Sequence, residues 1–233
     1  MARSVVLAIS FRHNVFAANP SCFVCYRYGV SPSRSTTGRH CKTERPSTLV
    51  MSSGPMDEIL SWDTLALSRA IQSKKVSCVE VMEATLNRID AINPQCNAII
   101  LLRDREELLA EARLADSSTT SDGWLHGIPT AVKDISNVKG IPTTMGGSRL
   151  SKNFVPNMSD FHVDQMIRAG AIVIGKTNSP ENGLGSHTYN ERWGTTLNPF
   201  DLTKSAGGSS GGAGVAVATR MLSFADGTDS KSR

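Results

Sequence analysis

Residues 207–212 read Gly-Gly-Ser-Ser-Gly-Gly and stand immediately before an apolar run, Ala213 to Met221, that is typical of a helix. Glycine allows backbone turns that other residues avoid, so such a loop can aim its two hydroxyl groups at a bound molecule. Taken alone, a run of glycine and serine is more typical of a flexible linker. The segments upstream of the loop are therefore needed to choose between these interpretations.

Short apolar runs separated by glycine and proline precede the loop from Trp124 onward. We predict buried strands over residues 129–132 and 171–175, because short apolar runs between turn residues are typical of a covered sheet. Residues 160–169 carry apolar side chains at helical spacing and end at Gly170, so a helix is expected there. A strand, a helix and a strand in this order predict a βαβ unit and hence an α/β fold.

The chain before residue 118 is predicted to be mainly helical. Helices are expected over residues 64–72 and 104–116, and another from the capping box of Ser77 and Glu80 to a stop at Asn93-Pro94. A short strand is expected over residues 97–102, and residues 117–123 are predicted to form a surface loop.

Lys133 is the first candidate catalytic residue, because it follows an apolar strand and precedes Asp134. In α/β folds the carboxyl ends of strands are where active sites lie. Burial favours the neutral form of a lysine, which can then act as a general base. On position alone, a solvated surface lysine is the alternative.

Several segments in a fixed order resemble the amidase signature family: Gly127-Ile-Pro-Thr-Ala-Val-Lys133-Asp134, residues 169–178, Gly194-Thr-Thr-Leu-Asn-Pro199 and the loop at 207–212. The resemblance implies the N-terminal half of the amidase signature fold, an α/β architecture with a mixed central sheet covered by helices. It divides the chain into an Arg/Ser-rich leader (1–55), a partial amidase domain (56–229) and a divergent tail (230–233).

The resemblance also implies roles for the residues of the site. Lys133 matches the base of the family, and Ser209, within a cis peptide, matches the serine that relays its proton. Ser210 is expected to shape the loop, and Gly207 and Gly208 are expected to leave room for the substrate. These residues imply a serine-based amidohydrolase whose substrate is a small-molecule amide.

The family pattern continues through Asp226-Gly227-Thr228-Asp229 and is then interrupted. Family members continue with x-Gly-Gly-Ser, whose serine attacks the amide carbonyl, whereas this chain has Ser230-Lys-Ser-Arg233. Arg233 therefore stands at the nucleophile position. The resemblance implies an amidase-type hydrolase of carbon–nitrogen bonds that uses a Lys-Ser-Ser relay, with this chain a truncated, inactive fragment or isoform. The alternative is a catalytically dead, amidase-like protein that binds a ligand or regulates a partner.

Charge is distributed unevenly along the chain. Arginine and lysine predominate in residues 1–50, whereas the remainder is close to neutral, which argues against direct binding of nucleic acid. The leader is either a transit peptide or upstream sequence wrongly joined to the protein, so the expected location is the cytoplasm or the mitochondrion. No apolar run reaches the length of a membrane span.

No cofactor is predicted, because a serine relay requires neither a metal nor an organic group. Cys22-x-x-Cys25, with Cys41 and His40, lacks a familiar zinc spacing, so no metal site is expected. The stretch His187-Thr-Tyr-Asn190 is compatible with a pocket lining or with an ordinary surface loop. The oligomeric state and the identity of the amide are not determined by these residues.

Overall fold

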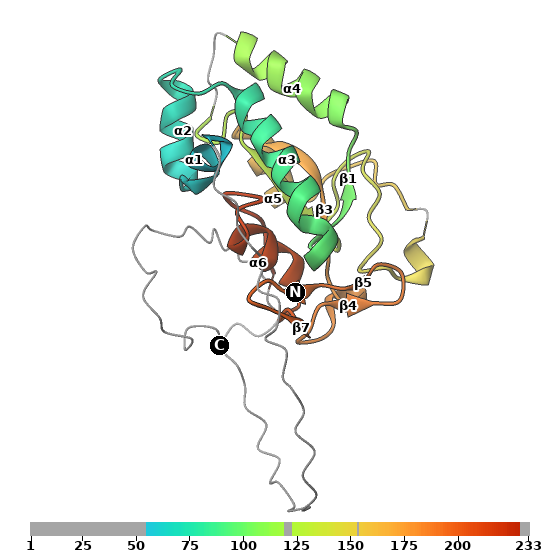
Figure 1. Ribbon diagram of the computed structural model, residues 1–233. Coiled ribbons are helices and arrows are strands. Elements are labelled where there is room, and N and C mark those ends of the chain that lie inside the picture. Colours follow the sequence, from blue (N-terminus) through green and yellow to red (C-terminus); the bar gives the residue numbers. More distant parts are fainter. Residues whose placement is uncertain (1–54, 119–122, 153, 229–233) are drawn as a thin grey trace, which may run out of the picture.

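The computed structural model of this 233-residue chain describes residues 55–118, 123–152 and 154–228 (Figure 1). Apart from Pro55, the predicted leader lies outside the described residues, as do Asp229 and the predicted tail. Side chains are described from Glu58 onward.

The N-terminal part of the described chain is mainly helical, as predicted, although the first helix, α1, was not among the predicted ones. Asp63 caps the start of helix α2, because its carboxylate accepts a hydrogen bond from the Ala66 N–H at 2.7 Å. The capping box of Ser77 and Glu80 is present at the start of α3, so two of the unpaired N–H groups there are satisfied reciprocally. The helices of this part are α1 (Pro55–Ser61), α2 (Thr64–Gln72), α3 (Cys78–Cys96) and α4 (Arg105–Ser117).

The predicted stop of α3 at Asn93-Pro94 is wrong, because the helix continues through Pro94 to Cys96. A proline removes one backbone donor, and here Ile92 and Cys96 compensate by packing in the core, 4% and 0% exposed. The helix ends at Asn97, which takes a left-handed conformation (φ 53°). For this reason the following strand starts at Ile99 rather than at residue 97.

A mixed sheet lies at the centre of the fold, as the resemblance implies. It has the order β1-β3-β2, formed by β1 (Ile99–Leu102), β2 (Pro129–Lys133) and β3 (Ile172–Thr177). Strand β3 pairs antiparallel with β1 and parallel with β2, and α5 (Phe161–Arg168) connects the parallel pair as the predicted βαβ unit. Strand β2 extends one residue beyond the prediction and includes Lys133, and β3 extends to Thr177.

Short elements fill the rest of the chain, η2 between β2 and α5 and the others between β3 and the last helix. They are two 3-10 turns, η2 (Arg149–Ser151) and η3 (Glu181–Gly183), and two small hairpins, β4 (Tyr189–Asn190) with β5 (Gly194–Thr195) and β6 (Leu197–Asn198) with β7 (Asp201–Ser205). Helix α6 (Gly211–Ala218) begins within the glycine loop and is shorter at its end than the predicted helical run.

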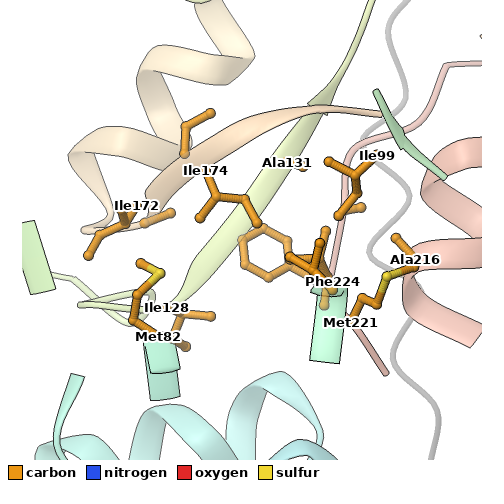
Figure 2. Packing of buried hydrophobic residues seen from close by; sticks show 14 of the residues in the cluster. Met82, Ile99, Ile128, Ala131, Ile172, Ile174, Ala216, Met221 and Phe224 are labelled. Carbon is orange, nitrogen blue, oxygen red and sulfur yellow. The ribbon is translucent and has the colours of Figure 1, made fainter. Parts of the chain in front are cut away.

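The segment that follows α6 enters the hydrophobic core (Figure 2). Met221 is fully buried, and Phe224 lies near Ile174 of β3 with 6% of its surface exposed. The Thr130 hydroxyl of β2 donates a hydrogen bond to the Phe224 carbonyl at 3.3 Å. Because the core holds this segment beside β2, the residues that come next, Asp226 and Thr228, reach the end of that strand.

Within the described ranges, none of the helices combines the length and the apolar character that crossing a bilayer requires.

Candidate active site

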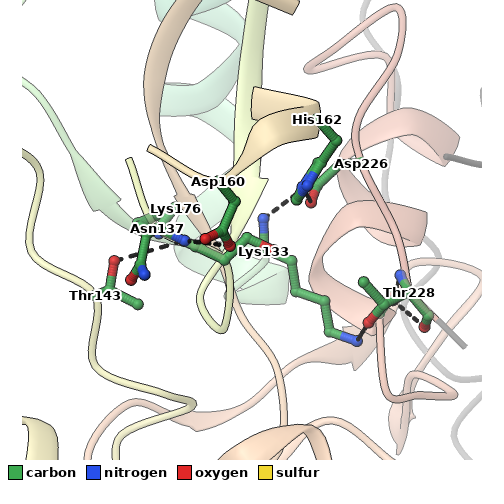
Figure 3. Close-up of polar contacts among 10 residues, drawn as sticks. Lys133, Asn137, Thr143, Asp160, His162, Lys176, Asp226 and Thr228 are labelled. Carbon is green, nitrogen blue, oxygen red and sulfur yellow. Dashed lines mark hydrogen bonds and ion pairs between the residues drawn. The ribbon is translucent and has the colours of Figure 1, made fainter. Parts of the chain in front are cut away.

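Lys133 is the last residue of β2, and its side chain is fully buried. Its Nζ donates hydrogen bonds to Ser209 Oγ at 2.7 Å and to Thr228 Oγ1 at 2.9 Å. Figure 3 shows the lysine side chain running from the strand to Thr228. The fold thus brings into contact the two predicted catalytic residues, which are 76 positions apart in the chain.

The glycine-serine loop carries Ser209 at its centre. The peptide bond between Gly208 and Ser209 is cis, as the resemblance implies. Ser209 is half-buried, whereas Gly207 and Gly208 are exposed, and a methyl group added to Gly207 would meet no described atom within 4 Å. Gly207 therefore lies on an open side of the loop, whereas a methyl group added to Gly208 would lie 3.0 Å from the His187 backbone.

Ser210 anchors the loop to the segment that follows α6. Its hydroxyl accepts a hydrogen bond from the Thr228 N–H at 3.1 Å and donates one to the Thr228 carbonyl at 3.2 Å. Thr228 thus bonds through its side chain to Lys133 and through its backbone to Ser210. Ser210 thus joins the glycine-serine loop to Thr228.

Thr188 holds the two ends of the loop together. Its fully buried hydroxyl accepts a hydrogen bond from the Gly211 N–H at 2.9 Å and donates one to the Gly207 carbonyl at 2.9 Å. Gly211 is the first residue of α6, and the Gly212 N–H donates to the Asn178 carbonyl at 3.2 Å. The first N–H groups of a helix have no partner within the helix, so these contacts from distant segments satisfy them.

Asp134 organises the neighbouring loop from the buried position next to Lys133. Its carboxylate accepts hydrogen bonds from the Thr144 N–H at 2.9 Å, the Gly146 N–H at 3.0 Å and the Thr144 hydroxyl. The Trp193 indole N–H donates to the same threonine hydroxyl at 2.9 Å. Asp134 is therefore a structural partner of the loop and does not contact Ser209 in any bond described here.

Two further titratable groups lie behind the lysine, His162 at the start of α5 and Lys176 of β3. Desolvation by burial lowers the pKa of Lys176 to about 8, and its Nζ donates to the Ser136 carbonyl. The Asp226 carboxylate, whose Oδ2 lies 3.5 Å from the ring Nε2, raises the pKa of His162 above its ordinary value of 6.5, against the opposing effect of burial. These groups surround the carboxyl end of β2 with buried charge.

The described residues contain no cluster of three or more histidine, cysteine, aspartate or glutamate side chains that could hold a metal ion. The leader cysteines, which were considered as zinc ligands, fall outside the described residues.

The fold is α/β with a mixed sheet, and its site combines a buried lysine at a strand end with a serine in a glycine loop. These features are those of the amidase-type hydrolases. The chain belongs to the amidase family, whose model matches residues 80–230.

Curated relatives agree with this assignment. The chain is 42% identical over 165 residues to a glutamyl-tRNA(Gln) amidotransferase subunit from Chromobacterium violaceum, covering 70% of this chain and 34% of that protein. It is 38% identical over 177 residues to an acylamidase of Rhodococcus erythropolis, covering 74% of this chain and 37% of the relative. The chain thus spans about a third of the length of these relatives.

Solved structures agree as well. A fatty acid amide hydrolase superposes with a TM-score of 0.68 at 26% identity, covering 75% of this chain and 31% of that one. A 6-aminohexanoate cyclic dimer hydrolase, solved with its substrate, superposes with a TM-score of 0.63 at 34% identity, covering 71% and 33%.

Sequence reasoning singled out Lys133 and the loop but assigned no role to Asp226 or His162. It placed Thr188 in a pocket lining or a surface loop, whereas this residue is fully buried. Thr188 lies in the stretch 187–190 and Asp226 in the stretch 226–229. The signal that could have found them is a polar residue next to a motif. His162 gave no such signal, because its partner is far away in the sequence.

Proposed function

We propose that this protein is an amidase-type hydrolase that cleaves carbon–nitrogen amide bonds with Lys133 as the base and Ser209 as the proton relay. The observation that carries the proposal is the 2.7 Å contact between Lys133 Nζ and Ser209 Oγ. This distance lies within the range required for proton transfer between a base and a hydroxyl group.

In the proposed reaction, an attacking serine hydroxyl forms a bond to the amide carbonyl carbon and gives its proton to Ser209 Oγ. Ser209 in turn gives its own proton to neutral Lys133. When the tetrahedral intermediate collapses, the carbon–nitrogen bond breaks and the relay returns a proton to the leaving amine. Water then attacks the acyl ester by the same route, releasing the acid and restoring the serine.

Residues 230–233 have no serine at the position where the family pattern has the attacking serine. Arg233 stands at the position where family members have the nucleophile, and Lys231 and Ser232 replace the preceding glycines. We therefore propose that the relay is inactive in a chain with these residues at 231–233.

A serine-reactive fluorophosphonate tests this proposal directly. The chain with Lys231→Gly, Ser232→Gly and Arg233→Ser regains the x-Gly-Gly-Ser pattern and is expected to be labelled at position 233. In that background, Lys133→Met and Ser209→Ala are expected to reduce labelling by about a hundredfold or more, since each removes a step of general base catalysis. Ser210→Ala serves as the adjacent control and is expected to reduce it less. Equal labelling of the unmodified chain, or full labelling after Lys133→Met, contradicts the relay.

A second candidate function, binding of an amide without cleavage, follows from residues 230–233. With Ser230-Lys-Ser-Arg233 as its tail, a chain that keeps the Lys133–Ser209 pair and the open loop would bind an amide without cleaving it. Calorimetry with a panel of aryl, fatty-acid and simple carboxamides tests this alternative: saturable binding by the unmodified chain, lost in Ser209→Ala, supports it.

A small-molecule amide is the proposed substrate, because the relatives carry names such as acylamidase and fatty acid amide hydrolase. We propose no direct binding of nucleic acid. We propose that the protein lies in the mitochondrion or the cytoplasm. A fluorescent protein fused behind residues 1–55 distinguishes the two, because a transit peptide directs import and any other leader leaves the fusion in the cytoplasm.

A further inference from the structure

Asp226 lies between the backbone of the proposed base and a histidine from another element. Its Oδ1 accepts a hydrogen bond from the Lys133 backbone N–H at 2.6 Å. Its Oδ2 lies 3.5 Å from His162 Nε2 (Figure 3). The aspartate side chain is 1% exposed and the histidine side chain 15% exposed, so water has little access to the contact.

The second carboxylate oxygen depends on this histidine. Among the described residues, Asp226 Oδ2 and His162 Nε2 have no hydrogen-bond partner that meets normal geometry. A buried carboxylate that lacks a full set of partners is costly, and a nearby positive charge offsets that cost. A protonated His162 supplies such a charge at the position where Asp226 holds β2.

Other charged groups face the same region from each neighbouring element. Asp160, at the start of α5, favours the protonated form of His162, and Lys176 of β3 opposes it. Lys176 itself is influenced by Asp134, Asp160 and Asp226. The histidine is therefore one member of a mixed cluster, and it is the member whose ordinary pKa is nearest neutrality.

We propose that His162 and Asp226 are positioning residues that hold the carboxyl end of β2, and with it the Lys133 side chain, in an arrangement that depends on the protonation of His162. The catalytic meaning of this inference rests on the proposed function, since it concerns the placement of the proposed base. The structural part, a link between His162 and the Lys133 backbone, can be measured without any turnover.

The direction of the pH effect follows from the shift of the histidine. Its pKa in the folded chain is raised above the ordinary value of 6.5. The stabilisation from the ion pair is therefore fully present below about pH 6.5 and is lost as the pH rises through the folded pKa. The arrangement around Lys133 is expected to loosen on the alkaline side of neutrality.

The first test is a titration of the full 233-residue chain by nuclear magnetic resonance, with labelled histidine and lysine, over about pH 5 to 9. His162 is expected to titrate with a midpoint above 6.5, and the Lys133 amide resonance is expected to shift with the same midpoint. A midpoint at or below 6.5, or a Lys133 amide that does not respond to the titration of His162, overturns the proposal. This measurement uses the parent chain alone, so it does not depend on whether a variant folds.

Variants then separate positioning from general stability. His162→Gln is expected to abolish the titration of the Lys133 amide, whereas the control His126→Gln, whose ring bonds to the Ala115 carbonyl, leaves it in place. Asp226→Asn keeps an oxygen for the Lys133 N–H and is expected to bring the His162 midpoint back toward its ordinary value. If the Lys133 amide titrates identically in His162→Gln, another group moves it and the proposal fails.

The failure of this inference differs from the failure of the proposed function. In the chain with Gly-Gly-Ser restored at 231–233, turnover whose pH profile is unchanged by His162→Gln refutes the positioning role alone. A coupled titration in a chain that never reacts with an amide or a fluorophosphonate supports the structural link and rejects the proposed hydrolase.

Discussion

Replacing Thr188 by valine removes the hydroxyl that joins the two ends of the glycine-serine loop while it keeps a branched side chain in a fully buried position. The Gly211 N–H, also buried, then loses its acceptor at the start of α6. An unsatisfied buried donor costs about 1–3 kcal/mol. Gly207 is an exposed residue, so its carbonyl is expected to bond to water in the variant and to add less to this cost.

We therefore expect Thr188→Val to lower the free energy of unfolding by about 2 kcal/mol, which corresponds to roughly 4–8 °C in Tm for a domain of this size. Thr188→Ser keeps the hydroxyl and loses one methyl group, so a smaller cost of about 1 kcal/mol is expected. Urea denaturation of the three chains, followed by circular dichroism, measures both differences. Exchange of the Gly211 amide with deuterium reports whether the loss is local.

The matched control is Thr203→Val, because the Thr203 hydroxyl also bonds to a neighbour, the Asp201 carboxylate, but at an exposed site. Its effect is expected to stay within about 0.5 kcal/mol, as for most surface substitutions. The reasoning is refuted if Thr188→Val unfolds at the same urea concentration as the parent chain, or if Thr188→Ser is as destabilising as Thr188→Val.

Three further predictions concern packing and charge around the site. Gly212→Ala is expected to destabilise the chain strongly in urea denaturation, because the new methyl group would collide with the Asn178 backbone, whereas Gly214→Ala, which meets no described atom within 4 Å, is expected to stabilise α6 by up to about 1 kcal/mol. Asp134→Ala is expected to cost about 3 kcal/mol or more in the same assay, since it leaves several buried donors without an acceptor; a loss below about 1 kcal/mol would contradict this. In the folded chain the pKa of Lys176 is about 8, below its ordinary value of 10.5. Between these two pH values the lysine is protonated in the unfolded chain and largely neutral in the folded one, so stability rises with pH. The free energy of unfolding is therefore expected to increase from pH 8 to 10 in the parent chain but not in Lys176→Met.

Local sequence signals predicted the secondary structure well where neighbouring residues decide it. The capping box of Ser77 and Glu80 placed the start of α3, and apolar runs between glycines placed β2 and β3 to within two residues. The end of α3 was mispredicted at Pro94, because packing of the last turn against the core outweighed the missing donor of proline.

The sequence by itself therefore determined the family, the α/β class and two members of the candidate site, Lys133 and Ser209, since these depend on short motifs in a fixed order. Only the tertiary structure decided what surrounds them. Thr188, Asp226 and His162 act through contacts between segments far apart in the chain, and no local pattern encodes such a contact. The core packing of residues 221–225 beside β2 creates these contacts, because it places Asp226 against the backbone of Lys133 and within reach of His162.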